Sequence, residues 1–451
     1  MANDPAAAAA LLARLERDGI EHLWVTYHDY SGRAAAKSIP RTSFRSAVED
    51  GVVFALANLN MDALDHQAET ATLLADSGDF LALPDPRSYA VLPRYPNTAR
   101  VHTWMRATDG TPWPGCPRTR LQWMADELAH DGFSAYVALE PEFYLLHRDG
   151  DGGYVPVNRT RMFSEEGLAV EDQFIRAVLA DLAAMGVTVP QFGKEYGLGQ
   201  YEMSIRHTAP VAAVDHYYTL KSAVRDAARD RGYVATFMPK LDATWSGNSM
   251  HAHVSVWDAA GERDLTASSE DDSSLSDLGR WFMGGLLHHI DALTGLGSPT
   301  VNSYKRLLPG SWAPANTYWG YGNRSGVIRV PGVGDRRHIE LRSGDNSAQP
   351  ALFVTGLLAA GLDGIRGQMD PGPAFERDIG HMSQEEVATA GIGYLPRSLP
   401  EALAALEADE AIAGAVGPEA LRHFLTVKRS ELSQYNLTVH PWERDAYLEV
   451  I

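Results

Sequence analysis

The chain has 451 residues, which is enough for two or three domains, and 45% of them are hydrophobic, which suffices for a large core. Its 58 Asp and Glu exceed its 39 Lys and Arg, and the resulting net charge of −19 argues against partners such as nucleic acid or an anionic membrane. The single cysteine, Cys116, excludes an internal disulfide framework and favours a reducing compartment.

The N-terminal region predicts a short helix followed by a small mixed sheet. Residues 1–20 lack a basic stretch ahead of their apolar run, so they make a poor secretory signal and we expect a cytoplasmic protein. Their pattern predicts an amphipathic helix with Leu11, Leu12 and Leu15 facing inward. From residue 22 to about residue 105, short β-rich runs alternate with turns, which predicts the sheet.

A Pro- and Gly-rich segment at 108–119 is the predicted joint to a second domain. Beyond it the sequence predicts helices at 121–129, 170–185, 211–230 and 275–293, and a strand at 136–146. The apolar run at 351–362 is too short to span a bilayer and fits a buried helix. His288 and His289 would point in different directions from their helix, and we interpret them as structural.

Four short polar motifs follow one another along the second domain. They are ALEPEFYL with Glu140 and Glu142, KEYGLGQYE with Glu195 and Glu202, SMHAHVS with His251 and His253, and HIELR with Glu340 and Arg342. Because side chains at i and i+2 share one face of a strand, three of these motifs each present two polar groups on one side. A solvated strand face explains any one pair alone, but it explains four such motifs in one chain poorly.

Uncompensated carboxylates at this density are costly, and divalent cations remove that cost. Oxygen ligands with one imidazole suit Mg²⁺ or Mn²⁺ that bridges substrate phosphates. The chain has no GxxxxGK[ST] loop and no GxGxxG, so metals and arginines would have to hold a nucleotide. The motifs therefore predict a divalent-metal site for phosphoryl transfer from ATP.

Two arginines in the segment NRSGVIRV are candidate phosphate ligands, because guanidinium groups bind phosphate in bidentate fashion. Arg324 and Arg329 are five residues apart and would face opposite sides of a regular strand, unless a bulge or turn at Gly326 brings both towards one ligand. The alternative is that they are surface arginines that pair with the excess of acidic residues.

The order E-P-E, E-Y-G-x-G-Q-x-E, M-H-x-H-x-S, N-S-Y-K-R-L-x-P-G, N-R-S-x-x-I-R and E-L-R resembles the glutamine synthetase family nearly end to end. The resemblance implies an α+β fold with an N-terminal β-grasp domain over residues 1–107. A catalytic domain over 108–451 would follow, with a curved antiparallel sheet, surrounding helices and a helical part from about 378. It also implies a homo-oligomer, a dodecamer of two stacked hexameric rings.

The resemblance assigns roles to individual residues. One metal would bind Glu142, Glu195 and Glu202, and the other Glu140, His251 and Glu340. ATP would contact His253, Ser255, Arg324 and Arg329, and glutamate would contact Gly247, Arg306 and Arg342. Two to three Mg²⁺ or Mn²⁺ ions would act with ATP as co-substrate, and Arg324 would stabilise the transferred phosphoryl group. The family makes γ-glutamyl phosphate, from which an amine then displaces phosphate.

The chain departs from the family pattern where ammonia would bind. The flap after N-S-Y-K-R-L-x-P-G carries a glutamate in ammonia-using members, and here that position is Trp312. The aspartate of an F-D-G-S-S segment is replaced by Ala55, and a serine of that segment by Asn58. The asparagine before Gly247 is replaced by Ser246.

These departures favour a ligase that makes a γ-glutamyl amide from glutamate and a small organic amine, as in the branch of γ-glutamylmethylamide synthetases. Trp312 would contribute an apolar face for the carbon skeleton of the amine. Asp62, Asp65 and His66 are candidates for a replacement base only by their proximity to the altered segment. The alternatives are an ammonia-using glutamine synthetase and a catalytically inactive ring protein, and the intact ligand positions argue against the second.

Overall fold

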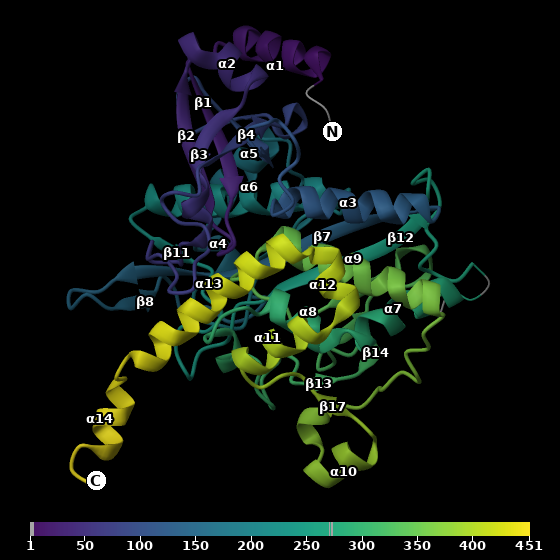
Figure 1. The fold of residues 1–451 in the computed structure, drawn as a ribbon. Coiled ribbons are helices and arrows are strands. Elements are labelled where there is room, and N and C mark those ends of the chain that lie inside the picture. Colours follow the sequence, from purple (N-terminus) through teal and green to yellow (C-terminus); the bar gives the residue numbers. More distant parts are fainter. Residues whose placement is uncertain (1–3, 270, 272–273) are drawn as a thin grey trace.

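The computed structural model describes residues 4–269, 271 and 274–451 (Figure 1). In that part of the chain, a first sheet has six strands in the order β2-β1-β6-β4-β3, with β5 added to β6. They are β1 (His22–His28), β2 (Ala34–Pro40), β3 (Val52–Ala55), β4 (Asp79–Pro84), β5 (Ala90–Val91) and β6 (Thr98–Arg106). Strands β1 and β6 run parallel and the other pairs antiparallel, so the predicted mixed sheet is confirmed. Its description as a β-grasp stays a prediction.

The predicted N-terminal helix is α1 (Pro5–Arg17), which lies beside α2 (Phe44–Glu49) at the top of Figure 1. It begins where the side chain of Asp4 accepts a hydrogen bond from the backbone N–H of Ala6, an N-cap that satisfies a free helix donor. Leu11 and Leu15 are fully buried, as expected, whereas Leu12 is only partly covered.

A second sheet carries the polar motifs. Among the described residues it has nine strands, in the order β14-β15-β16-β12-β7-β10-β9, with β8 and β11 also on β7. They are β7 (Phe133–Arg148), β8 (Tyr154–Pro156), β9 (Gln191–Lys194), β10 (Gln200–Ser204), β11 (Val234–Thr236), β12 (Met250–Asp258), β14 (Trp319–Tyr321), β15 (Ile328–Val330) and β16 (Ile339–Leu341). The long central strand β7 contains the predicted strand and pairs with β12 over nine residues. Strands β13 (Asn316–Thr317) and β17 (Gly393–Tyr394) pair separately.

Most of the remaining helices lie around this sheet, whereas α14 projects away from it (Figure 1), and the mixed α+β class predicted from the sequence is confirmed. They are α3 (Pro117–His130), α4 (Glu165–Ala169), α5 (Asp172–Ala184), α6 (Pro210–Arg229), α7 (Asp277–His288), α8 (Ile290–Gly297), α9 (Pro350–Gly367), α10 (Gln384–Thr389), α11 (Leu399–Ala408), α12 (Glu410–Val416), α13 (Pro418–Leu437) and α14 (Pro441–Tyr447). The run at 351–362 lies in α9 and is buried nearly all round, as predicted. Within the described part of the chain, no helix combines the length and apolar composition needed to cross a bilayer.

The helix predicted at 275–293 is two helices, because the chain breaks at His289. The buried ring of His289 lies 2.7 Å from Asp409 Oδ2 through Nδ1 and 3.0 Å from Asp363 Oδ2 through Nε2. Burial lowers the pKa of this imidazole, but the two carboxylates outweigh burial and raise it above its ordinary value. The contacts join α8 to α9 and to the N-cap of α12, so the structural interpretation of His289 is confirmed.

The predicted joint leads directly into α3, and buried charges tie the two sheets together there. Arg118 of α3 donates to Asp85 at 2.8 Å, beside the first sheet, and to Asp215 of α6 at 2.7 Å. Tyr30 donates through its hydroxyl to the carbonyl of Gly115 at 2.6 Å. A domain boundary at residue 107 stays a prediction. The part from about 378 is largely helical, as expected.

Candidate active site

Strand register brings the motif carboxylates together on one face of the second sheet. Glu140 of β7 lies directly opposite His251 of β12, and Glu142 lies directly opposite Glu202 of β10. Directly paired residues of antiparallel strands have Cβ atoms about 4.5–5.5 Å apart, so these side chains are close neighbours. On the far side of β12, His253 is paired with Glu340 of β16. Four strands therefore supply polar groups to one place.

Glu140 is at the centre of this group. Its Oε2 lies 3.4 Å from His251 Nδ1 and 3.2 Å from His253 Nε2, and its Oε1 accepts a hydrogen bond from the hydroxyl of Ser204. Two sets of three side chains have ligand atoms that all lie within 4.8 Å of one another: Glu140, Glu202 and His251, and Glu140, His253 and Glu340. Both sets have the geometry to hold a metal ion.

The two sets of metal ligands predicted from the sequence share residues with these two groups of three side chains but are not identical to them. The predicted set of Glu140, His251 and Glu340 is connected, because Glu340 Oε1 lies 3.4 Å from His251 Nδ1. In the predicted set with Glu142 and Glu202, Glu195 follows β9, and its Oε2 accepts a hydrogen bond from the backbone of Tyr196 at 3.0 Å. The division of these ligands between metals stays a prediction.

Electrostatics show how much negative charge is concentrated here. Burial and then the charge of Glu195 raise the pKa of Glu142 to about 7. The pKa of Glu202 is raised well above its ordinary value, first by burial and then by four surrounding carboxylates, those of Glu140, Glu142, Glu195 and Glu340. Such mutual repulsion is relieved by bound cations. The donor set, mainly carboxylates with imidazole, therefore fits Mg²⁺ or Mn²⁺.

Glu340 differs from the other carboxylates because arginines flank it. It is almost fully buried, and burial alone would raise its pKa, but the charges of Arg342, the nearby histidines and Arg329 lower it strongly. Arg342 pairs with Oε1, and Arg329 donates to Oε2 at 2.8 Å. Both guanidinium groups keep a buried Nε without a partner among the described residues, so each has donor capacity left for a ligand.

The two candidate phosphate-binding arginines come from different local structures. Arg329 lies in β15, whereas Arg324 is exposed in the turn before that strand. The two arginines therefore do not lie on one regular strand, because a turn that includes Gly326 separates Arg324 from β15, as the sequence left open. That both arginines contact one ligand stays a prediction. Burial raises the pKa of Glu195 above its ordinary value, and the charge of Arg324 offsets part of that rise, so this turn lies within electrostatic range of the carboxylates.

The predicted glutamate ligands Gly247 and Arg306 lie against each other. A Cβ atom on Gly247 would lie 2.5 Å from Arg306 Cγ, so any larger residue would displace the arginine. The carbonyl of Gly247 accepts a hydrogen bond from Gln200 Nε2 at 2.8 Å, and that of Ser246 accepts one from the Tyr144 hydroxyl at 2.9 Å. The buried Arg306 donates to the carbonyls of Ser343 and Gly344, and its Nε has no partner in the described chain. Position 247 therefore requires glycine, and it lies next to an Arg306 Nε–H group that is available to a ligand.

Sequence reasoning missed two members of the cluster. His338 Nε2 lies 3.0 Å from His253 Nδ1, and Ser204 contacts Glu140. Both residues stand two positions from a motif glutamate, so the i, i+2 rule would have found them. Ser255, a predicted ATP ligand, lies further along β12 and accepts a hydrogen bond from Trp257 Nε1 at 2.8 Å.

Trp312 lies beside the metal-ligand segment. Its side chain is 66% exposed, and its ring faces that of Tyr196 at a centroid distance of 6.4 Å and an interplanar angle of 27°. Tyr196 directly follows Glu195 in the chain. The aromatic Trp312, which the sequence predicts to replace the flap glutamate, therefore faces the residue that follows a predicted metal ligand.

The candidate bases near Ala55 are already engaged. The buried Asp62 accepts hydrogen bonds from backbone N–H groups, including that of His66 at 3.0 Å, and from a side chain of α13. Although burial raises the pKa of Asp62, these bonds lower it below its ordinary value. Asp65 pairs with Arg33 at 2.9 Å. Ala55 is exposed at the end of β3.

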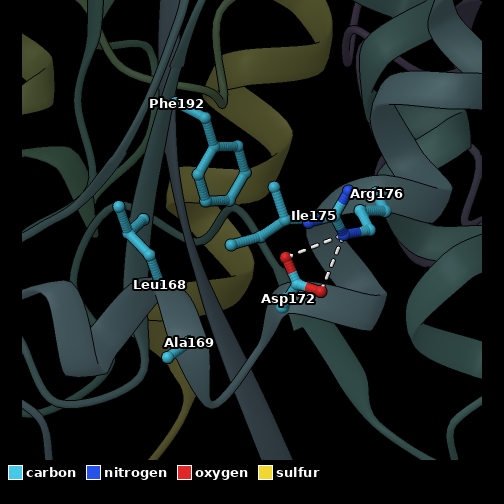
Figure 2. Close-up of a pocket in the computed structure, with 6 residues that line it drawn as sticks. All are labelled: Leu168, Ala169, Asp172, Ile175, Arg176 and Phe192. Carbon is cyan, nitrogen blue, oxygen red and sulfur yellow. Dashed lines mark hydrogen bonds and ion pairs between the residues drawn. The ribbon is translucent and has the colours of Figure 1, made fainter.

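A surface hollow of about 550 Å³ is lined by none of the motif carboxylates. Figure 2 shows the residues that line it. Apolar side chains of α4, α5 and β9 line it together with the Asp172–Arg176 ion pair of 2.7 Å. Phe192 lines the hollow, while its neighbour Gly193 is paired with Glu202. Because side chains alternate along a strand, the hollow lies on the opposite sheet face from the carboxylate of Glu202.

The sequence of the chain is similar to those of known proteins. Residues 114–447 match a family model described as "Glutamine synthetase, catalytic domain". A glutamine synthetase of Halobacterium salinarum is 34% identical over 98% of this chain and 96% of the relative. A glutamate–methylamine ligase of Methyloversatilis universalis is 33% identical over 96% of this chain and 98% of the relative.

Solved structures agree with the sequence relatives. A GmaS–ADP complex superposes with a TM-score of 0.86 at 31% identity, covering 97% of this chain and 99% of that chain. A structure described as a novel glutamine synthase homologue gives a TM-score of 0.81 at 28% identity, covering 93% and 96%. Enzymes of this family use ATP and divalent metal ions. The resemblance seen in the motifs is confirmed: the chain belongs to the glutamine synthetase family and is an enzyme that forms a carbon–nitrogen bond.

Proposed function

We propose that the chain is an ATP-dependent glutamate–amine ligase that makes a γ-glutamyl amide from glutamate and a small organic amine. The observation that carries this proposal is the exposed Trp312 ring, at the predicted position of the flap glutamate, which faces the ring of Tyr196. The relative named as a glutamate–methylamine ligase and the GmaS structures support it. The Halobacterium salinarum relative, named as a glutamine synthetase, keeps ammonia as the competing substrate.

Two chemical steps follow from the site. The γ-carboxylate of glutamate attacks the γ-phosphorus of ATP, so that a carbon-bound oxygen gains the phosphoryl group and ADP leaves. The nitrogen of the amine then attacks the γ-carbonyl carbon, phosphate leaves with its electron pair, and the nitrogen gives up a proton to a base. Divalent cations held by the six motif ligands would neutralise phosphate charge during the first step.

Two arginines bind the nucleotide and two others bind glutamate. Arg324 and Arg329 contact the nucleotide phosphates with His253 and Ser255, and Arg324 balances charge on the transferred phosphoryl group. Arg306 and Arg342 hold glutamate through donors such as their buried Nε–H groups, which have no partner among the described residues. Because a buried donor without a partner costs free energy, a bound carboxylate or phosphate improves both positions.

The amine specificity is tested by measuring ADP release with Mg²⁺, glutamate and a panel of amines that includes ammonia, alkylamines and weakly basic amines. We expect kcat/KM for at least one organic amine to exceed that for ammonia by about tenfold, a difference of roughly 1.4 kcal/mol. If ammonia is the best substrate, the chain is an ordinary glutamine synthetase. If no amine supports turnover, it is an inactive relative.

We also propose that the chain assembles into a dodecamer of two stacked hexameric rings. The end of α13 and α14 projects from the body of the subunit (Figure 1) and exposes a run of large apolar residues: Leu437, Val439, Trp442, Leu448, Val450 and Ile451. A patch of this kind marks a protein–protein contact.

Sedimentation velocity tests the assembly. We expect the wild-type chain to sediment as a species far larger than a dimer, and a variant that ends at residue 438 to give smaller species, because the truncation removes most of this apolar surface. Circular dichroism of the truncated variant checks that the subunit still folds. A wild-type monomer that is active at low concentration would contradict the ring.

A further inference from the structure

Two exposed aromatic rings face each other without being in close contact. Tyr196 is 67% exposed and Trp312 66%, and their ring centroids are 6.4 Å apart. Elsewhere in the chain the buried rings of His28 and Tyr218 stack with centroids 3.6 Å apart and planes 7° apart. Paired rings span about 4.5–7 Å, so the exposed pair is near the outer limit of that range. The two faces therefore leave room near them.

Contacts of nearby residues place the segments that carry Tyr196 and Trp312 next to the predicted metal and glutamate sites. The backbone N–H of Tyr196 donates to Glu195 Oε2 at 3.0 Å, which anchors the ring beside a carboxylate of the predicted metal site. Trp312 follows six residues after Arg306, which packs on Gly247. Gln200, the first residue of β10 and four residues after Tyr196, donates to the carbonyl of Gly247 at 2.8 Å. The ring pair therefore stands where the predicted metal and glutamate sites meet.

We propose that Tyr196 is the second wall of the amine-binding site, and that Tyr196 and Trp312 together cover the hydrocarbon body of a primary monoamine that lies along the ring pair. This rests on the proposed glutamate–amine ligase activity. Each methylene that the rings cover favours binding roughly fourfold, whereas ammonia has no carbon to cover. A diamine of the same length would have to bring a second ammonium group to a ring pair that contains no carboxylate, and loss of hydration there is unfavourable.

The test compares butylamine, 1,4-diaminobutane and ammonia in ADP release by the wild type and three variants. Tyr196→Ala is expected to lower the ratio of kcat/KM for butylamine to that for ammonia about tenfold, mainly through KM for butylamine, because one apolar wall is lost. Tyr196→Phe is expected to keep the wild-type ratio, because the ring is retained. Tyr154→Ala removes another exposed tyrosine, on β8, and serves as the matched control.

The outcomes separate the amine site from the proposed function. If Tyr196→Ala lowers turnover of butylamine and ammonia equally, the ring supports Glu195 instead of the amine, and the proposal fails. If the wild type prefers organic amines but its ratio is unchanged in Tyr196→Ala, the second wall is wrong and the ligase activity stands. A wild-type preference for 1,4-diaminobutane over butylamine overturns the monoamine class. A wild-type preference for ammonia overturns the ligase proposal and the amine site together.

Discussion

Glu140→Gln is expected to lower ADP release by at least about a thousandfold, because an amide is a poor ligand for Mg²⁺ and a lost metal contribution of several kcal/mol corresponds to that factor. Glu140 belongs to both groups of three side chains that have metal-binding geometry. The substitution keeps the size of the side chain and one acceptor oxygen next to Ser204, His251 and His253. The fold should therefore survive while the metal site fails.

The experiment combines ADP release across a Mg²⁺ titration with thermal melting of the variant. Glu171→Gln is the matched control, because Glu171 is also a buried glutamate but hydrogen bonds to Asn158 at 3.2 Å, away from the cluster. We expect the control to keep wild-type turnover. Near-normal turnover of Glu140→Gln in limiting Mg²⁺ would remove Glu140 from the metal site.

Glu340→Ala is a less clear test of the same site. Glu340 is buried between Arg329 and Arg342, and truncating it would leave two guanidinium groups without their carboxylate. Removing one partner of a buried ion pair costs about 3–5 kcal/mol, which is comparable with much of the stability of a domain. A loss of activity in that variant could result from the lost metal ligand or from unfolding, and the assay alone would not separate the two causes.

The residues of the site could be predicted from sequence, but their pairing could not. The i, i+2 spacing placed Glu140 and Glu142 on one face of a strand, and β7 contains both. The opposition of Glu142 to Glu202 depends on the register between β7 and β10, which are separated by some 50 residues of chain. The alternation along each strand decides which face a side chain takes, but strands joined by so long a segment have no tight turn to fix which residues lie opposite each other.

The elements that differ from their sequence prediction lie where residues distant in the chain come into contact. The helix break at His289 follows from its two carboxylate partners, Asp363 and Asp409, which lie far along the chain. The turn that carries Arg324 interrupts a segment whose composition is that of a strand. Tyr196 was present in the motif KEYGLGQYE, but only the folded chain shows that its ring faces that of Trp312.

Trp312→Glu is expected to narrow the preference for an organic amine over ammonia by about tenfold, since it removes an apolar wall and restores a carboxylate. Alkylammonium ions have pKa values near that of lysine, about 10.4, so almost no amine is nucleophilic at neutral pH without a base. A carboxylate at this position attracts the cation and accepts its proton, whereas an indole offers only a cation–π attraction of roughly 0.5–2 kcal/mol.

Two further variants separate the apolar and the charged contributions. Trp312→Phe keeps an aromatic wall and should retain the amine preference, whereas Trp312→Gln removes the wall without adding charge. Because the side chain is 66% exposed, none of these changes opens a core cavity, so each variant should fold and can be compared by kcat/KM across the amine panel. If Trp312→Gln alone narrows the preference as far as Trp312→Glu, loss of the wall explains the effect. If Trp312→Glu improves ammonia turnover beyond Trp312→Gln, the missing carboxylate is what keeps ammonia from being the substrate. If neither variant moves the ratio, Trp312 does not contact the amine.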